Sequence, residues 1–402
     1  MPIFSTEMTR RSLKTRTAIP LALSSNHIGY SQLLCRTAAT LCMTLPHGCD
    51  VRSFSLIPIL AVIIVAAIIL NMAWIDMSLR KIMAFSIVLL PHSSEVYIHL
   101  CNLNWTASLL PCLFLFQPPL ASVKDRRSLF TIVTTAILGL SSMYVTILSP
   151  LFGFRFLRQR QKTSGEIILL VTIVVTSAIQ TFVVFSNGLI MSSTNDATPA
   201  FAPVFSPFIT FINAIFILPF ASYVTSVELL QMALHDIGIF IPTAILVTTM
   251  CLSIIYLWIS SNKQARTYSL TLFGLGYYLI VACAARTANN LQLYIPMRSA
   301  DRYFFLPYFF FTVALTSIIA IKNGTITRKI VSYFVIATLT IFYISEWRII
   351  RAPEGADEIW RQQLNKLHST GTWDFNPKNG IYHPDHSKTP VKGQVNMDIL
   401  PQ

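Results

Sequence analysis

The chain has 402 residues, of which 53% are hydrophobic and 12% charged, with a formal net charge of +13 and a mean hydropathy of +0.59. This composition is far more apolar than that of an ordinary soluble domain, so it predicts a polytopic membrane protein. The positive charge does not indicate nucleic-acid binding, because the basic residues are spread over short loops between apolar runs, where they orient a membrane protein.

The first 45 residues contain no secure membrane span. Residues 1–26 carry four basic side chains, between Arg10 and Arg16, and one acid, Glu7. We expect them to be disordered and interpret them as an altered or truncated start, with a transit peptide as the alternative. Residues 29–45 alternate apolar groups with Gln32 and Arg36, which predicts an interfacial helix.

Six apolar runs are long enough to cross a bilayer, which takes about 20 residues. They are Phe54 to Trp74, Glu166 to Ser186, Gly238 to Ser260, Tyr268 to Ala285, Tyr303 to Ile321 and Lys329 to Trp347. Two further runs contain proline: Pro91 interrupts Ile82 to Leu100, and Pro111 lies within Trp105 to Leu120. Proline frees backbone groups that only protein or cavity water can satisfy, so we expect these two helices to lie inside the bundle or line a site.

Lys and Arg gather in five short loops, and such loops face the cytoplasm. They are Arg80-Lys81, Lys124 to Arg127, Arg155 to Lys162, Lys263 to Arg266 and Lys322 to Arg328. An even number of crossings must separate any two of them. We therefore predict that Leu129 to Phe154 enters and returns as a hairpin of short or half-depth helices turning near Ser141 and Ser142. Pro207 to Leu234 is predicted to be re-entrant or interfacial.

Together these elements predict an all-α fold, a polytopic membrane helical bundle. We expect about 8 to 10 membrane segments, including the re-entrant or half-depth helices, within residues 27–347. Residues 348–402 are richer in Gly, Pro, Asn and Asp and form a short non-cytoplasmic tail. The same topology places residues 91–104 and 285–302 at the outer face.

Charged residues at that outer face break the charge rule. Arg298, Asp301 and Arg302 stand directly before Tyr303, and Arg286 ends the preceding apolar run. One interpretation is that they are ordinary loop charges. The other is an anion site at the outer membrane boundary, in which guanidinium groups bind a phosphate and Asp301 orients one of them.

A second outer group follows Pro91. If this stretch is helical, His92, Glu95, His99 and Asn102 share one stripe, which suggests a pocket wall. We take Glu95 and His99 as the candidate catalytic residues, with Glu95 as a general base or orienting carboxylate. The alternatives are residues that only hydrate a helix end, or a divalent cation held by both histidines and Glu95, although their spacing matches no recognised zinc pattern. No cofactor motif is present.

Three stretches resemble a group of bacterial multi-spanning proteins that is similar to the C superfamily of glycosyltransferases (GT-C). They are Gly29 to Arg36, Pro91 to Trp105, and Arg302 to Tyr308. Ser31 and Cys35 depart from the first motif. The resemblance runs from about residue 27 into the tail. It implies a multi-pass enzyme of the bacterial inner membrane that takes a sugar from a polyprenyl-phosphate carrier at the outer face and passes it to a glycan, lipid or protein of the envelope.

The resemblance also implies roles for the outer residues. Arg298 and Arg302 would hold the carrier phosphate, Asn102 would shape the sugar or acceptor pocket, and Trp105 or Tyr303 would stack on a sugar ring. GT-C enzymes generally carry an acidic catalytic residue after a first membrane helix, and no such helix precedes residue 27. An inactive truncated relative is therefore an alternative, as is a transporter or flippase for an anionic amphiphile that uses the same arginines.

Overall fold

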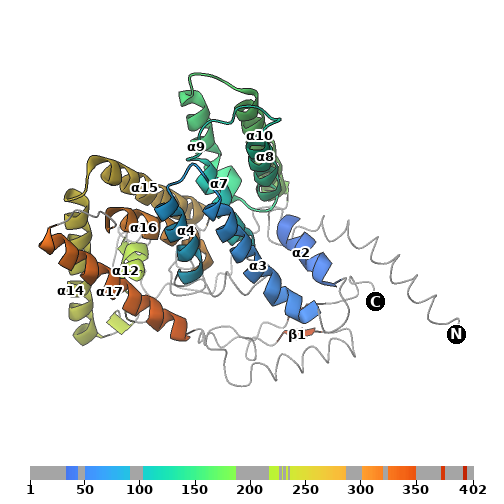
Figure 1. Cartoon of the computed structure of the whole chain (residues 1–402). Coiled ribbons are helices and arrows are strands. Elements are labelled where there is room, and N and C mark those ends of the chain that lie inside the picture. The colour runs from blue at the N-terminus through green and yellow to red at the C-terminus, as the bar shows by residue number, and fades with distance from the viewer. Residues whose placement is uncertain are drawn as a thin grey trace. The chain divides into compact units, whose positions relative to one another are not determined.

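The computed structural model describes thirteen helices in its larger unit, residues 26–347, and two strands in a second unit, residues 1–25 with 348–402 (Figure 1). The described residues are 33–43, 50–90, 103–186, 217–225, 229, 232–233, 236–286, 301–319, 325–349, 373–375 and 393–395. In the second unit, β1 (Trp373–Phe375) pairs antiparallel with β2 (Gly393–Val395). The composition of the tail gave no indication of these strands.

The described elements of the larger unit are all helices, as the sequence predicts. In chain order they are α2 (Leu33–Met43), α3 (Asp50–Leu70), α4 (Met77–Leu89), α6 (Leu103–Ala107), α7 (Leu109–Phe114), α8 (Arg126–Gly139), α9 (Tyr144–Arg158), α10 (Ser164–Ser186), α12 (Leu218–Val224), α14 (Ile237–Ile259), α15 (Lys263–Arg286), α16 (Asp301–Ile319) and α17 (Ile326–Ile349). α2 lies within the region predicted as an interfacial helix, and α12 within the predicted re-entrant element.

Three of these helices are long and apolar enough to cross a membrane, namely α10, α14 and α17. They leave large apolar side chains exposed, such as Val171 at 54%, Leu252 at 62% and Ile330 at 62%. Exposing such surface to water costs about 25 cal/mol per Å², so these faces are suited to lipid. The coarse prediction of a helical membrane protein agrees with this finding, while the count of 8 to 10 segments stays a prediction.

α16 differs from these three because its aromatic residues are buried within the protein. Phe304, Phe305 and residues 308–311 are at most 1% exposed, and α4, α6, α14 and α15 all contact this helix. The apolar run that the sequence suggested as a span is thus the core of the helical unit. Its described apolar stretch, Phe304–Ile319, is also shorter than the three long helices.

Both proline-containing runs are broken in the way the sequence predicts. α4 ends at Leu89, and Leu90 takes an extended conformation because the proline at position 91 disfavours a helical residue before it. The second run forms two short helices, α6 and α7, joined at Ser108, and each of their residues is buried. Pro111 lies in the first turn of α7, where its missing N–H leaves no hydrogen bond unmade.

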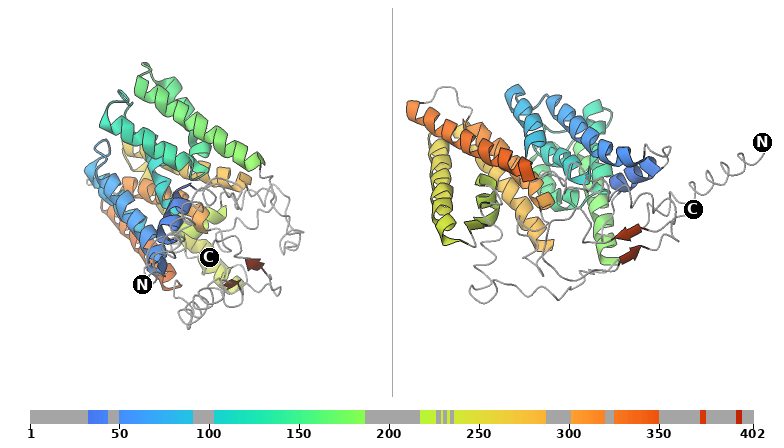
Figure 2. Two further views of the ribbon diagram at one scale, coloured as in Figure 1. Left: turned by 90° about the vertical axis from the view of Figure 1, so that its right-hand side faces the viewer. Right: turned by 90° about the horizontal axis from the view of Figure 1, so that it is seen from below.

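α8 and α9 form the predicted hairpin, with the turn at residues 140–143. Their 14 and 15 residues correspond to about 21 to 22 Å, short of the roughly 30 Å of a bilayer's hydrocarbon core. The hairpin packs beside α10, and the three helices lie together in teal and green (Figures 1 and 2). At its tip, Ser141 Oγ accepts from the backbone N–H of Leu34 at 3.0 Å, and Ser142 Oγ lies 3.0 Å from Ser108 Oγ.

Close packing of α8 on α10 depends on a glycine. A Cβ added at Gly139 would lie 2.5 Å from Oγ1 of Thr176, too near for any other residue without a shift. The same approach lets Gln180 Nε2 donate to the Gly139 carbonyl at 2.9 Å. Gln180 is fully buried, so this polar side chain in the second half of α10 has a packing role.

Arg328 joins the ends of three helices at one side of the unit. Its guanidinium donates to the carbonyls of Leu257 in α14 and Ile318 in α16, and to the hydroxyls of Ser260 and Ser261. The side chain is 4% exposed. Carbonyls in the last turn of a helix lack intrahelical partners and lie at the negative end of the helix dipole, so one buried cation stabilises both ends.

Replacing Arg328 with methionine should destabilise the fold by about 3 kcal/mol, because the Ile318 carbonyl loses its donor and the Leu257 carbonyl keeps only the hydroxyls of Ser260 and Ser261. Thermal unfolding of the purified protein in detergent measures the loss. Lys329→Met is the matched control, since Lys329 is the next residue of α17 and is exposed. Equal melting temperatures for the two variants would contradict this role of Arg328.

Candidate functional site

α15 and α16 form the tightest helix pair near the predicted outer site. A Cβ added at Gly276 would lie 2.6 Å from Cε1 of Phe311 and 3.2 Å from the Pro307 carbonyl, so the glycine permits the approach. The rings of Phe273 and Tyr277 in α15 lie 5.2 and 5.0 Å from that of Phe311. These contacts hold the two helices in a fixed register.

The direction of the pair follows from contacts at one end. α15 begins at Lys263, two residues after Ser261, and Arg328 binds both Ser261 and the Ile318 carbonyl near the end of α16. The start of α15 and the end of α16 therefore lie together, and the two helices are antiparallel. It follows that Arg286, which ends α15, and Asp301, which begins α16, lie at the opposite end of the pair.

Several residues predicted for the outer site thus have backbones at one place in the fold. Arg286 is the last residue of α15, and Asp301, Arg302 and Tyr303 are the first three of α16. The N-terminus of α16 adds backbone N–H groups without intrahelical partners and the positive end of a helix dipole. Backbone position alone thus brings arginine and N–H donors together at this end.

Trp105 belongs to the same neighbourhood. Its ring meets that of Tyr144 edge to face, with centroids 5.1 Å apart, and the Tyr144 hydroxyl lies 3.6 Å from Cys283 Sγ. Cys283 is three residues before Arg286, so these contacts connect the start of α6 to the end of α15. Trp105 itself is only 6% exposed, so in this conformation its ring packs the wall of the site instead of offering a face to a sugar.

Asn104 is a polar residue of this wall that is not among the predicted site residues. It is 2% exposed, and its side-chain oxygen Oδ1 has no hydrogen-bond partner among the described residues. A buried amide oxygen without a partner is unfavourable, by about 1 to 3 kcal/mol, unless water or a ligand donates to it. Its position directly before Trp105, at the end of a polar stretch, was the signal available in the sequence.

The remaining predicted residues, Glu95, His99, Asn102 and Arg298, lie outside the described residues, as does His92. The structure therefore brings together Trp105 and the backbones of Arg286 and residues 301–303. Within the described chain, no three His, Cys, Asp or Glu side chains are close enough to hold a metal ion.

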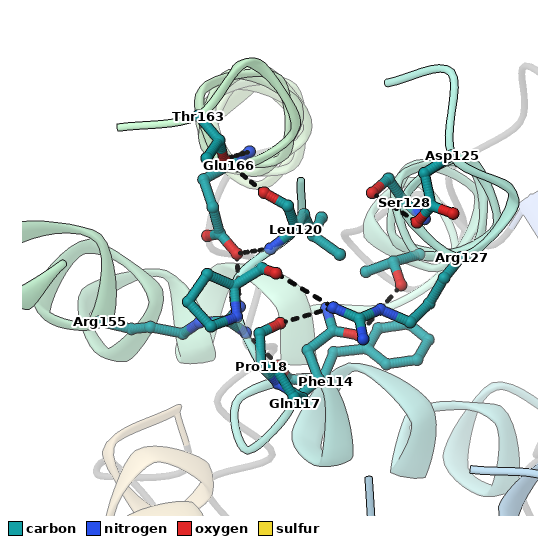
Figure 3. Close-up of polar contacts among 12 residues, drawn as sticks. Phe114, Gln117, Pro118, Leu120, Asp125, Arg127, Ser128, Arg155, Thr163 and Glu166 are labelled. Atoms are coloured by element: carbon teal, nitrogen blue, oxygen red, sulfur yellow. Dashed lines mark hydrogen bonds and ion pairs between the residues drawn. The ribbon is translucent and has the colours of Figure 1, made fainter. Parts of the chain in front are cut away.

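A second polar cluster lies at the other side of the unit, around the α9–α10 connection (Figure 3). Arg155 Nη2 donates to Glu166 Oε1 at 2.5 Å, and the same oxygen accepts from the backbone N–H of Leu120 at 2.7 Å. Arg155 also donates to the Phe114 carbonyl, and Thr163 Oγ1 to that of Leu120. These bonds tie the ends of α7, α9 and α10 together, so we assign this cluster a structural role.

Arg127 and Asp125 extend this cluster to the start of α8. Arg127 Nη2 donates to the carbonyls of Pro118 and Pro119 at 2.9 and 3.1 Å. The backbone N–H of Ser128 donates to the Asp125 carboxylate at 3.1 Å and lowers the pKa of that carboxyl. The Asp125 carboxylate, which caps α8, therefore stays charged at neutral pH. Its stabilisation of the helix is lost only as the pH falls through the lowered pKa.

The basic loops around this cluster lie on one side of the helical unit. The α3–α4, α9–α10 and α14–α15 connections all lie toward the upper side in Figure 1. The guanidinium of Arg127 lies 5.7 Å from the Trp74 ring in the α3–α4 connection, and Arg80 donates to the Leu70 carbonyl at 2.8 Å. This arrangement agrees with the expectation that these loops share a face.

The sequence matches no protein-family model, and it shows no significant similarity to a curated protein or to a solved structure.

Removing one member of the Arg155–Glu166 pair, in which Glu166 is buried and Arg155 half-buried, should destabilise the protein by roughly 3 kcal/mol, because the remaining charge is left without its partner. We expect Arg155→Met and Glu166→Gln each to lower the melting temperature in detergent. The double variant should lose less than the sum of the two. Strict additivity would show that the pair does not act as a unit.

Proposed function

We propose that the chain is a multi-pass protein of the bacterial inner membrane that transfers a sugar from a polyprenyl-phosphate carrier to an envelope glycan, lipid or protein. The observation that carries this proposal is the position of Arg286, Asp301 and Arg302 at the end of the α15–α16 pair opposite to Arg328. The resemblance of three sequence stretches to GT-C-like proteins supplies the reaction class.

Sugar transfer from a phosphate carrier requires groups that stabilise an anion, and this end of the α15–α16 pair would supply them. When the bond between the sugar and the carrier phosphate breaks, negative charge grows on the departing phosphate. Guanidinium donors from Arg298 and Arg302, together with the N–H groups at the start of α16, would stabilise that charge. Glu95 would accept the proton of the attacking hydroxyl, and His99 would assist it.

The wall formed by α6 and the hairpin tip would support this site. Asn104 offers a buried amide oxygen that a sugar hydroxyl or water could donate to. Trp105 and Tyr144 close the apolar side of the wall and exclude water from it. Exclusion of water strengthens the arginine–phosphate interaction and limits transfer of the sugar to water. A divalent cation remains compatible with this scheme through His92, Glu95 and His99.

A transporter or flippase for an anionic amphiphile is the second candidate. Transporters commonly place ionisable residues near the middle of their membrane helices. In the part of the chain that the structure describes, the buried charged side chains are Glu166 near the start of α10 and Arg328 near the start of α17. Neither lies at mid-helix, which favours the transferase.

The topology behind this proposal can be tested with cysteine labelling. In a background without the native cysteines, Asp196→Cys should react with a membrane-impermeant maleimide in intact cells. Gln264→Cys, which precedes Arg266 in a basic loop, should react only after permeabilisation. The reverse pattern would place Arg286 and Arg302 on the cytoplasmic side and remove the outer anion site.

Loss of either outer arginine should reduce sugar transfer strongly. Replacing Arg298 or Arg302 with alanine removes charge-assisted hydrogen bonds, each of which supports about a tenfold to hundredfold effect. We expect lower incorporation of sugar from polyprenyl-phosphate donors into membranes, with normal expression. Lys263→Ala, at the other end of α15, should leave incorporation unchanged.

The variant Glu95→Gln distinguishes the two candidate functions. A transferase should keep donor binding and lose product, whereas a transporter should keep translocation.

A further inference from the structure

The end of α9 combines exposed cations with exposed apolar side chains. Arg158, Arg160 and Lys162 are exposed, and between and beside them Phe154 is 56% and Leu157 76% exposed. Exposed leucine and phenylalanine next to three cations are unfavourable for a surface that meets only water. We call these five residues the basic end of α9.

Contacts with aromatic rings orient Arg158 and Lys162 but do not neutralise their charge. The Arg158 guanidinium lies 4.9 Å from the centroid of the Phe154 ring, and Lys162 Nζ lies 4.3 Å from that of Phe156. Lys162 also donates to the Phe156 carbonyl. Such cation–π contacts orient the charged groups and leave N–H donors available to an anion.

No carboxylate among the described residues pairs with Arg158, Arg160 or Lys162. The acid nearest in sequence is Glu166, and its Oε1 already accepts from Arg155 and from the backbone of Leu120. The basic end of α9 therefore keeps an uncompensated positive charge. A fitting partner supplies anionic oxygens to the cations and an apolar region to Phe154 and Leu157.

The position of this surface identifies that partner. α9 packs against α10, whose face carries exposed Ile167 and Ile168 and is suited to lipid. The basic end of α9 thus lies beside the start of a helix long enough to cross the membrane. Cations next to apolar side chains at such a boundary meet lipid headgroups and the upper part of the acyl chains at once.

We propose that the basic end of α9 is a binding site for the phosphate groups of anionic phospholipids in the leaflet that it faces. Arg158, Arg160 and Lys162 bind the headgroup, while Phe154 and Leu157 enter the interface. The site has a structural use, because the α8–α9 hairpin is too short to span the hydrocarbon core and needs an anchor at its open end. This inference does not depend on the sugar-transfer proposal.

The test uses the full chain purified in detergent and titrated with phosphatidylglycerol or phosphatidylcholine, with bound lipid counted by native mass spectrometry. We expect clear preference for phosphatidylglycerol. The triple variant Arg158→Gln, Arg160→Gln, Lys162→Gln should bind it about a hundredfold more weakly, at roughly fivefold per charge. Melting temperatures of the variants without added lipid confirm that they are folded.

Three further measurements make the outcome decisive. A second triple variant, Lys81→Gln, Lys263→Gln, Lys329→Gln, removes the same charge from three exposed positions elsewhere and should retain affinity within about twofold. Phe154→Ala with Leu157→Ala should weaken binding, and inorganic phosphate should not displace the lipid. Equal losses in the two triple variants, full retention in the first, or displacement by phosphate alone would each overturn the proposal.

Discussion

The structure depends on satisfying backbone groups where helices end inside the protein, because lipid offers them no hydrogen bonds. Two arginines meet this need. Arg155 donates to the Phe114 carbonyl at the end of α7, and Arg328 to the carbonyls of Leu257 and Ile318 near the ends of α14 and α16. Basic residues of the kind that orient a membrane protein thus also satisfy helix ends here, so they contribute to stability.

The two ends of the α15–α16 pair differ in the helix polarity that an arginine meets there. At one end Arg328 binds carbonyls, which are the negative ends of helices, and its charge is therefore used within the protein. At the other end Arg302 lies in the first turn of α16, where the helix presents its positive end. An arginine there gains nothing from the helix dipole. This difference in polarity supports the proposed phosphate site.

Local features of the fold were predictable from the sequence, and long-range ones were not. Pro91 and Pro111 indicated where α4 ends and α6–α7 breaks, and counting crossings between basic loops indicated the α8–α9 hairpin. Hydropathy gave no means to distinguish a lipid-facing helix from a buried one, so the burial of α16 in the core was not predictable. The partners of Arg328 and Glu166 are 67 and 46 residues away in sequence, and no local pattern indicates such pairs. For the same reason Tyr144 was missed at the candidate site, whereas the position of Asn104 beside Trp105 was a local signal.

The hairpin connects the two regions to which we assign binding. α9 has the basic end at its C-terminus and Tyr144, which contacts Trp105 and Cys283, at its N-terminus. Between them the Tyr278 hydroxyl of α15 donates to the Ile147 carbonyl at 2.5 Å. α9 is about 22 Å long and has Pro150 inside it, between the Ile147 contact and the basic end. Lipid bound at the basic end would therefore act on the Tyr144 wall through a helix that the Tyr278 contact holds on the N-terminal side of this proline.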